Sequence, residues 1–149
     1  MKFIATKELG RLAKWLRILG YDTTYFNQDN KASFLISALR EDRVILTRNT
    51  RLTPSNGMRF LRIKSNFVSG QIKEVLSGLS LKPVEDCMFS RCVICNETLN
   101  SLPKEIAKDR VPQYVFNTQE VFLICLKCKR IFWQGTHWGN VRKTLEEIL

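Results

Sequence analysis

The sequence is poor in proline and glycine, which account for only 4 and 7 of its 149 residues. With a hydrophobic content of 44%, this scarcity excludes a disordered, collagen-like or low-complexity chain. No apolar run approaches the roughly 20 residues that a membrane-spanning helix needs, and the first ten residues lack the apolar segment of a secretory signal. We therefore expect a soluble, cytoplasmic, globular protein without a membrane partner.

Acidic residues are also scarce, because 14 Asp and Glu stand against 24 Lys and Arg, for a formal net charge of +10. The imbalance lies in residues 1–81, which hold 14 basic and 6 acidic side chains, whereas residues 82–149 hold 10 and 8. Such a charge favours a polyanionic partner, and nucleic acid is the commonest.

The first 79 residues alternate between strand-like and helical patterns. Because parallel strands need crossover connections, this alternation predicts an α/β fold, a parallel sheet flanked by helices. Ligands of such sheets bind beyond the carboxyl ends of the strands, here near Thr6, Asp29 and Asn49. The strand-like segments are 2–6, 22–26, 43–47 and the region around 60–65.

Two local features are predicted in this part of the chain. Gly20 stands where the first helix would need a glycine just beyond its last turn. A second helix, capped by Asp29 or Asn30, is expected to bury one apolar face. That face would consist of Ala32, Leu35, Ile36 and Leu39.

The cysteines are concentrated after Pro83, and we divide the chain into an α/β domain (1–82) and a zinc ribbon with a C-terminal helix (83–149). Four of the five form two C-x-x-C pairs, Cys92/Cys95 and Cys125/Cys128. Four thiolates suit tetrahedral Zn²⁺, and a full set leaves no open position for catalysis, so the zinc would be structural. Strand-like segments at 121–124 and 130–133 flank the second pair, and an insertion must lie between the pairs. Cys87 falls outside this pattern.

Basic and aromatic side chains suggest where nucleic acid would bind. A stripe of cations on the first helix favours a phosphate track over a merely solvated face, and two arginines follow the third strand. These candidates are Lys7, Arg11, Lys14, Arg17, Arg48 and Arg51. Near the end of the chain, His137 and Trp138 would either close the ribbon's core or serve in base stacking or as a catalytic imidazole.

Several motifs resemble the mut-seven C-terminal RNase domain family nearly from end to end. They are LGRLAKWLRILGYD (9–22), VILTR (44–48), the Arg91-Cys92 knuckle, Arg110-Val111-Pro112 and the segment from Trp133 to Trp138. The resemblance implies a PIN-like nuclease fold with an attached zinc ribbon. It also implies RNA cleavage by carboxylates that hold Mg²⁺ or Mn²⁺ at the strand ends.

The chain departs from this family's pattern at the expected metal site. Thr6 stands where the family has an Asp after the first strand, and Asn49 replaces the Asp of its T-R-D motif. Asp29 and Glu8 are the nearest remaining acids. The favoured hypothesis is an RNA-binding protein with a partly degenerate acidic site. The alternative is an active divalent-metal-dependent ribonuclease in which Asp29 and Glu8 hold the ion, with Thr6 and Asn49 as neutral ligands.

Overall fold

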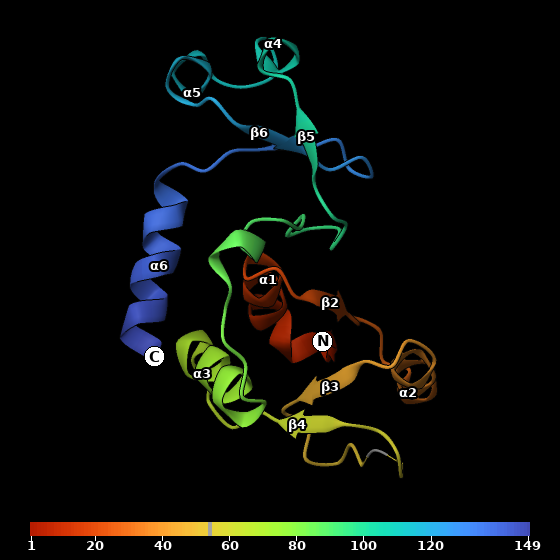
Figure 1. Cartoon of the computed structure of the whole chain (residues 1–149). Helices are drawn as coiled ribbons and strands as arrows, with labels where there is room; N and C mark the ends of the chain where they lie inside the picture. Colours follow the sequence, from red (N-terminus) through yellow and green to blue (C-terminus); the bar gives the residue numbers. More distant parts are fainter. Residues whose placement is uncertain (54) are drawn as a thin grey trace.

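The computed structural model describes residues 1–53 and 55–149 (Figure 1). Its first half is a parallel sheet with the strand order β2-β1-β3-β4, in which Ile4 pairs with both Thr24 and Ile45. The predicted α/β fold is therefore confirmed. The strands are β1 (Lys2–Ala5), β2 (Asp22–Tyr25), β3 (Val44–Thr47) and β4 (Phe60–Arg62), and the helices are α1 (Gly10–Ile18), α2 (Lys31–Arg40) and α3 (Val68–Gly78).

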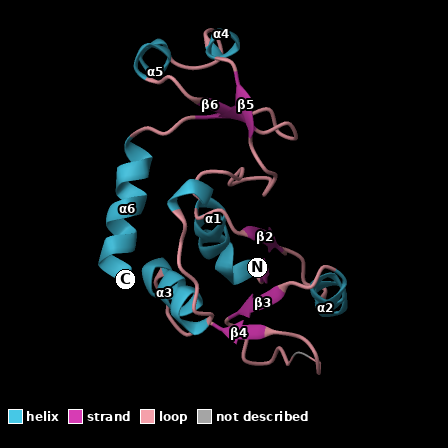
Figure 2. Ribbon diagram, in the orientation of Figure 1, coloured by secondary structure: helices cyan, strands magenta, loops and turns pink. Residues whose placement is uncertain are grey.

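The helices cover both faces of this sheet, as Figure 2 shows. Successive strand side chains point to opposite faces, so Phe3 and Ala5 pack with α1 and α3 while Ile4 packs against α2. Burial on both faces explains why the central strands β1 and β3 are continuous apolar runs. A four-residue strand can therefore contribute to two cores at once.

Helix α2 buries a different face from the predicted one. Phe34 and Ala38 are buried, whereas Ile36 and Leu39 are 54% and 62% exposed. Asn30 caps the helix by accepting a hydrogen bond from the backbone N–H of Ser33 at 3.0 Å, which confirms one of the two predicted caps. Apolar residues surround the helix, and the sheet buries the largest of them, Phe34. Leu35 is the one member of the predicted face that packs against this core, so the prediction is wrong for Ala32, Ile36 and Leu39.

Gly20 ends α1 as predicted. Its φ of +93° is a conformation that side-chain-bearing residues rarely adopt. A Cβ atom there would also lie 2.3 Å from the carbonyl oxygen of Cys87. The glycine thus lets the chain turn sharply and lets the segment before the first cysteine pair approach α1 closely.

The second half begins with an antiparallel sheet of β5 (Asn100–Leu102), β6 (Phe122–Ile124) and β7 (Ile131–Phe132). Strands β6 and β7 are the two segments predicted around the second cysteine pair. The expected insertion contains β5 and two short helices, α4 (Lys104–Ala107) and α5 (Gln113–Thr118). We call residues 91–133 the ribbon; its small core consists of Ala107, Val115 and Phe122 with a few partly buried neighbours.

The last helix, α6 (Thr136–Ile148), returns to the first half of the chain and runs beside α3 (Figure 1). Val141, Leu145 and Ile148 enter the same core as α1 and α3. We call the parallel sheet and the helices α1, α2 and α3 the body. The chain therefore leaves the body to form the ribbon and returns to the body in α6. The division of the chain into two domains between residues 82 and 83 stays a prediction. Across the described residues, the helices are too short or too polar to cross a membrane.

Candidate functional site

The four paired cysteines converge between the body and the ribbon sheet. Their sulfur atoms all lie within 4.8 Å of one another, and the Sγ atoms of Cys92 and Cys128 are 3.8 Å apart. Each pair sits in a tight turn that ends in a residue of positive φ, Asn96 at 66° and Lys129 at 63°. These turns let the backbone N–H of Cys95 donate to the Cys92 sulfur at 3.4 Å.

This geometry fits a tetrahedral metal ion. Zinc–sulfur bonds of about 2.3 Å place tetrahedral sulfurs about 3.8 Å apart, in agreement with the Cys92–Cys128 separation. The backbone N–H of Arg130 lowers the pKa of the Cys128 thiol to about 6, whereas burial and the neighbouring sulfurs raise the pKa of Cys95 to about 12. Cys128 is therefore the first of these two thiols to take the thiolate form that binds metal. Four protein ligands leave no position for a reacting water, so the site is suited to a structural Zn²⁺.

Arg17 joins the first cysteine turn to the body. Its side chain is buried and donates to the carbonyl oxygens of Thr23 at 2.9 Å, Val93 at 2.8 Å and Ile94 at 3.2 Å. The expected cationic stripe on α1 is thus wrong at this position, because these buried and partly buried carbonyls need a donor and the long side chain of Arg17 can reach them.

Asn96 makes a second connection, which no sequence pattern predicted. Its amide donates to the carboxylate of Asp22 at 2.7 Å and accepts from the backbone N–H of Thr23 at 3.0 Å. Asp22 also pairs with Arg43 at 2.7 Å, so it acts as a structural ion-pair partner. Together with Arg17, these bonds fasten the first cysteine turn to the edge strand β2.

We predict a pH dependence for this network. Partial burial raises the pKa of Asp22, but bonds from Arg43 and Asn96 outweigh it, and the pKa lies below its ordinary 3.8. The ionised carboxylate therefore stabilises the fold above about pH 4, and this stability is lost as the pH falls through the lowered pKa. Asp22→Asn should lower the free energy of unfolding at pH 7 by about 1–2 kcal/mol, with a smaller difference from wild type at pH 2.5.

Denaturant unfolding at both pH values measures this difference. Asp42→Asn is the matched control, because the Asp42 side chain is 89% exposed and pairs with Arg59 on the surface at 3.3 Å. An Asp22→Asn effect no larger than that of the control at pH 7 would contradict the prediction.

The carboxyl ends of β1 and β3 bring Thr6, Glu8 and Thr47 together. The Thr6 hydroxyl lies 3.3 Å from that of Thr47 and donates to the Glu8 carboxylate, which also accepts the backbone N–H of Arg48 at 3.0 Å. Partial burial raises the pKa of Glu8, yet these hydrogen bonds prevail and lower it. Glu8 is therefore an anion held by donors at the strand ends.

The remaining predicted members of this site, Asp29 and Asn49, bond to other groups than the Thr6–Glu8 cluster. Asp29 is 81% exposed and pairs with Lys7 at 2.5 Å, and the side-chain oxygen of Asn49 accepts the backbone N–H of Arg51 at 2.9 Å within its own loop. Thr6, Glu8, Asp29 and Asn49 line one pocket of about 250 Å³ with Lys7 and Arg51. Within residues 1–53 and 55–149, the metal-ligand groupings of three or more His, Cys, Asp or Glu comprise the cysteine set alone.

The predicted cations divide between two places. Lys7, which precedes α1, lies with Arg48 and Arg51 at the strand ends. Arg11 and Lys14 are exposed on α1 and line a separate shallow pocket beside the first cysteine turn. The structure thus offers two basic surfaces in place of one continuous stripe.

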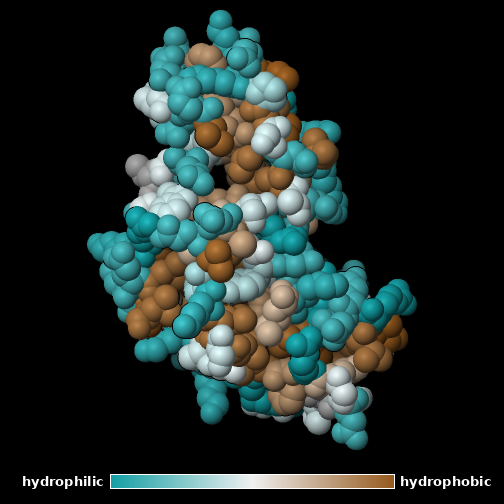
Figure 3. Space-filling view, in the orientation of Figure 1, coloured by the Kyte–Doolittle hydropathy of each residue, from teal (hydrophilic) through white to brown (hydrophobic). Residues whose placement is uncertain are grey.

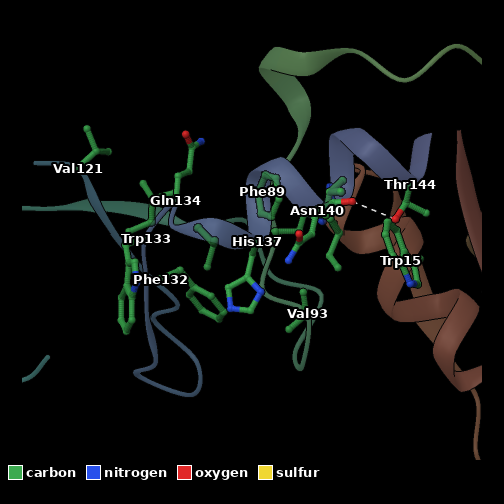
Figure 4. A pocket seen from close by; sticks show the side chains of 15 residues that line it. Trp15, Phe89, Val93, Val121, Phe132, Trp133, Gln134, His137, Asn140 and Thr144 are labelled. Carbon is green, nitrogen blue, oxygen red and sulfur yellow. Dashed lines mark hydrogen bonds between the residues drawn. The ribbon is translucent and has the colours of Figure 1, made fainter. Parts of the chain in front are cut away.

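The aromatic residues just before α6 and in its first turn contact different parts of the molecule. Trp138 packs on Phe89 with ring centroids 6.2 Å apart and lies beneath the Arg142 guanidinium, so it supports the junction between α6 and the chain before the ribbon. His137 is exposed and lines a large cavity, where Figure 4 shows it with Phe132 and Trp133. Trp133 also packs against Phe122 of the ribbon core.

The parallel sheet and the four-cysteine cluster define an α/β protein that carries a ribbon suited to hold a metal ion. Residues 1–145 match the family model of the Mut7-C RNAse domain, nearly the whole chain. The protein belongs to the Mut7-C RNAse domain family. No curated protein and no solved structure matches it significantly.

Proposed function

We propose that this protein binds RNA through the carboxyl edge of its parallel sheet and that zinc holds its ribbon in place. The observation that carries the proposal is the balance of charge at this edge. Its two acids are engaged by donors, Glu8 by hydroxyl and backbone groups and Asp29 by Lys7. Arg51 lines the same pocket, and the Arg48 guanidinium follows β3 and donates to the side chain of Asn66. Membership of an RNase domain family supports RNA as the polyanion.

Binding without cleavage follows from the side chains at the strand ends. Metal-dependent phosphodiester cleavage needs clustered anionic oxygens to hold Mg²⁺ or Mn²⁺ and activate water. Thr6 and Asn49 supply neutral oxygens, and the Asn49 oxygen is occupied within its own loop. Such a site has little negative charge with which to hold a divalent cation against the surrounding arginines.

The position of Glu8 favours a second candidate function, a metal-dependent ribonuclease. Its carboxylate reaches the hydroxyls of Thr6 and Thr47 and so returns an acid to the ends of β1 and β3. In this alternative, Glu8 and Asp29 would hold the ion, and Thr6 and Asn49 would complete the site as neutral ligands.

RNA binding by wild type should weaken steeply as salt rises. Arg48→Ala/Arg51→Ala should lower the affinity about tenfold and reduce the salt dependence, because two phosphate contacts are lost. The matched control is Arg40→Ala/Lys73→Ala, which removes the same charge from exposed positions on α2 and α3 that do not line the edge pocket. Fluorescence anisotropy with a labelled RNA pool measures both. Equal losses in the two variants, or salt-independent binding, would contradict the proposal.

Cleavage of the same pool with Mg²⁺ or Mn²⁺ separates the two functions. Wild type should leave the RNA intact, and Thr6→Asp/Asn49→Asp should gain metal-dependent cutting if the edge still aligns the phosphate. Metal-dependent cutting by wild type that is abolished by EDTA and by Glu8→Gln would establish the ribonuclease and overturn binding alone.

A further inference from the structure

A second cavity, separate from the strand-end edge, lies where the ribbon meets the body. It measures about 450 Å³, within the range of pockets that accept small organic ligands. Figure 3 shows the molecule hollowed at this junction, with apolar surface exposed beside it. Its walls come from separate parts of the chain, with Trp15 and Ile18 on α1, Phe132 and Trp133 at β7, and Val141 on α6.

The cavity combines aromatic walls with a few polar groups. Gln134, His137 and Asn140 supply amide and imidazole groups on its exposed side, and Figure 4 shows Phe132 and His137 converging within it. Flat aromatic surfaces suit a planar ring, and amide or imidazole groups suit the donors and acceptors along the edge of such a ring. This is the chemistry by which proteins hold unpaired nucleobases.

A basic surface adjoins the cavity. The shallow pocket of Arg11 and Lys14 shares Val93 with it, and the same helix, α1, carries Trp15 into the cavity one residue after Lys14. Two cations thus lie beside an aromatic cavity along one short helix. A nucleotide is complementary to this arrangement, because it joins an anionic phosphate to a flat base.

Contacts on two sides of the cavity hold its walls against the body. Arg17 and Asn96 fasten the first cysteine turn to the body, and Val141 on α6 is packed into the body core. Walls that are fixed before binding lose little conformational entropy when a ligand enters. The walls at the first cysteine turn and at Val141 are therefore in place before a ligand enters.

We propose that this cavity accepts one unpaired nucleobase of an RNA strand whose adjoining phosphates lie on Arg11 and Lys14. The inference rests on the proposed RNA binding and deepens it, because it makes single-stranded RNA the preferred ligand. A paired base has its hydrogen-bonding edge occupied and cannot leave the stack without cost, so a duplex of the same length would bind more weakly.

The test pairs variants of the cavity with matched variants of the ribbon surface. Phe132→Leu removes an aromatic wall but keeps an apolar side chain, and Gln134→Ala removes a polar group. Their controls are Tyr114→Leu and Gln113→Ala, both at exposed positions on α5 that do not line the cavity. Affinity is measured by anisotropy for a single-stranded 12-mer, for a duplex of that length, and for a 12-mer of abasic units.

We expect Phe132→Leu to weaken single-strand binding about tenfold, as loss of one base–aromatic stack does, while both controls bind as wild type does. The abasic strand should bind wild type about as weakly as the intact strand binds Phe132→Leu. Thermal unfolding and zinc content, unchanged in Phe132→Leu, would exclude a general loss of structure. Ultraviolet crosslinking of 4-thiouridine RNA should label the peptide that contains residues 131–140.

Two results would overturn the inference while RNA binding stands. One is equal affinity of wild type for the intact and abasic strands; the other is crosslinking confined to the strand-end edge with no effect of Phe132→Leu. If wild type bound no RNA at all, the proposed function itself would fail, together with this inference. Arg48→Ala/Arg51→Ala distinguishes the cases further, since it should weaken binding to the intact and abasic strands equally.

Discussion

Cys125→Ser is expected to abolish zinc binding and to unfold the ribbon while the body stays folded. The ribbon core is small, with three buried residues at its centre, and short domains with so little apolar burial need a metal or disulfides. Structural zinc supplies about 10–16 kcal/mol of binding energy in isolated zinc-finger peptides, all of it coupled to folding. By contrast, the body has its own core of sheet and helix residues, which does not depend on the cysteines.

Metal analysis and hydrogen exchange measure the two parts of this result. Wild type should hold one zinc per chain, and Cys125→Ser none. The amides of Leu123 and Ile124 should lose protection, whereas those of Ile45 and Leu46 in β3 keep it. Cys87→Ser is the matched control, because Cys87 is exposed and lies outside the four-cysteine cluster. Full zinc occupancy in Cys125→Ser would contradict the assignment of this ligand.

Arg17→Ala is expected to lower the free energy of unfolding by about 3 kcal/mol. The substitution leaves the carbonyls of Thr23, Val93 and Ile94 without their donor, and each buried unpaired group costs about 1–3 kcal/mol. Water can reach the partly exposed carbonyls near the ribbon, so the total falls below the sum of three such penalties. The connection between ribbon and body should loosen as well.

Denaturant unfolding gives the change in stability, with Arg11→Ala as the control on the same helix. Arg11 is exposed, and its loss should change the free energy of unfolding by less than about 0.5 kcal/mol. Arg17→Lys tests the geometry further, because an ammonium group on a shorter stem cannot bond the three carbonyls as the guanidinium does. Equal stability of Arg17→Ala and Arg11→Ala would show that the buried bonds add nothing.

The parallel sheet and the metal centre were both predictable from local patterns. Apolar runs indicated β1 and β3, since strands buried on both faces carry few polar residues. β-Branched and aromatic residues indicated β2, and the turn-rich stretch before residue 60 indicated the start of β4. The two C-x-x-C pairs indicated the metal site, because two thiolates separated by two residues need only a tight turn to hold one ion. Neither inference requires knowledge of distant contacts.

The candidate RNA site was predictable in part. The rule that ligands bind beyond the carboxyl ends of parallel strands placed Thr6, Asp29 and Asn49 at one edge, and one pocket includes all three. Residue spacing did not reveal that Asp29 would pair with Lys7 or that Glu8 would turn back onto Thr6. Their roles in binding or cleavage stay predictions.

By itself the sequence determined the type and order of the elements of the body, the four clustered cysteines and the basic character of the first half, because propensity, spacing and charge are local properties. Tertiary structure alone decided that α2 buries Phe34, that Arg17 donates to the carbonyl of Val93, 76 residues away, and that α1, α6 and the ribbon enclose a cavity. A helix with apolar residues on every side has no preferred rotation until a sheet selects one. Likewise, a cationic side chain is available to bind phosphate only where it does not already donate to buried carbonyls.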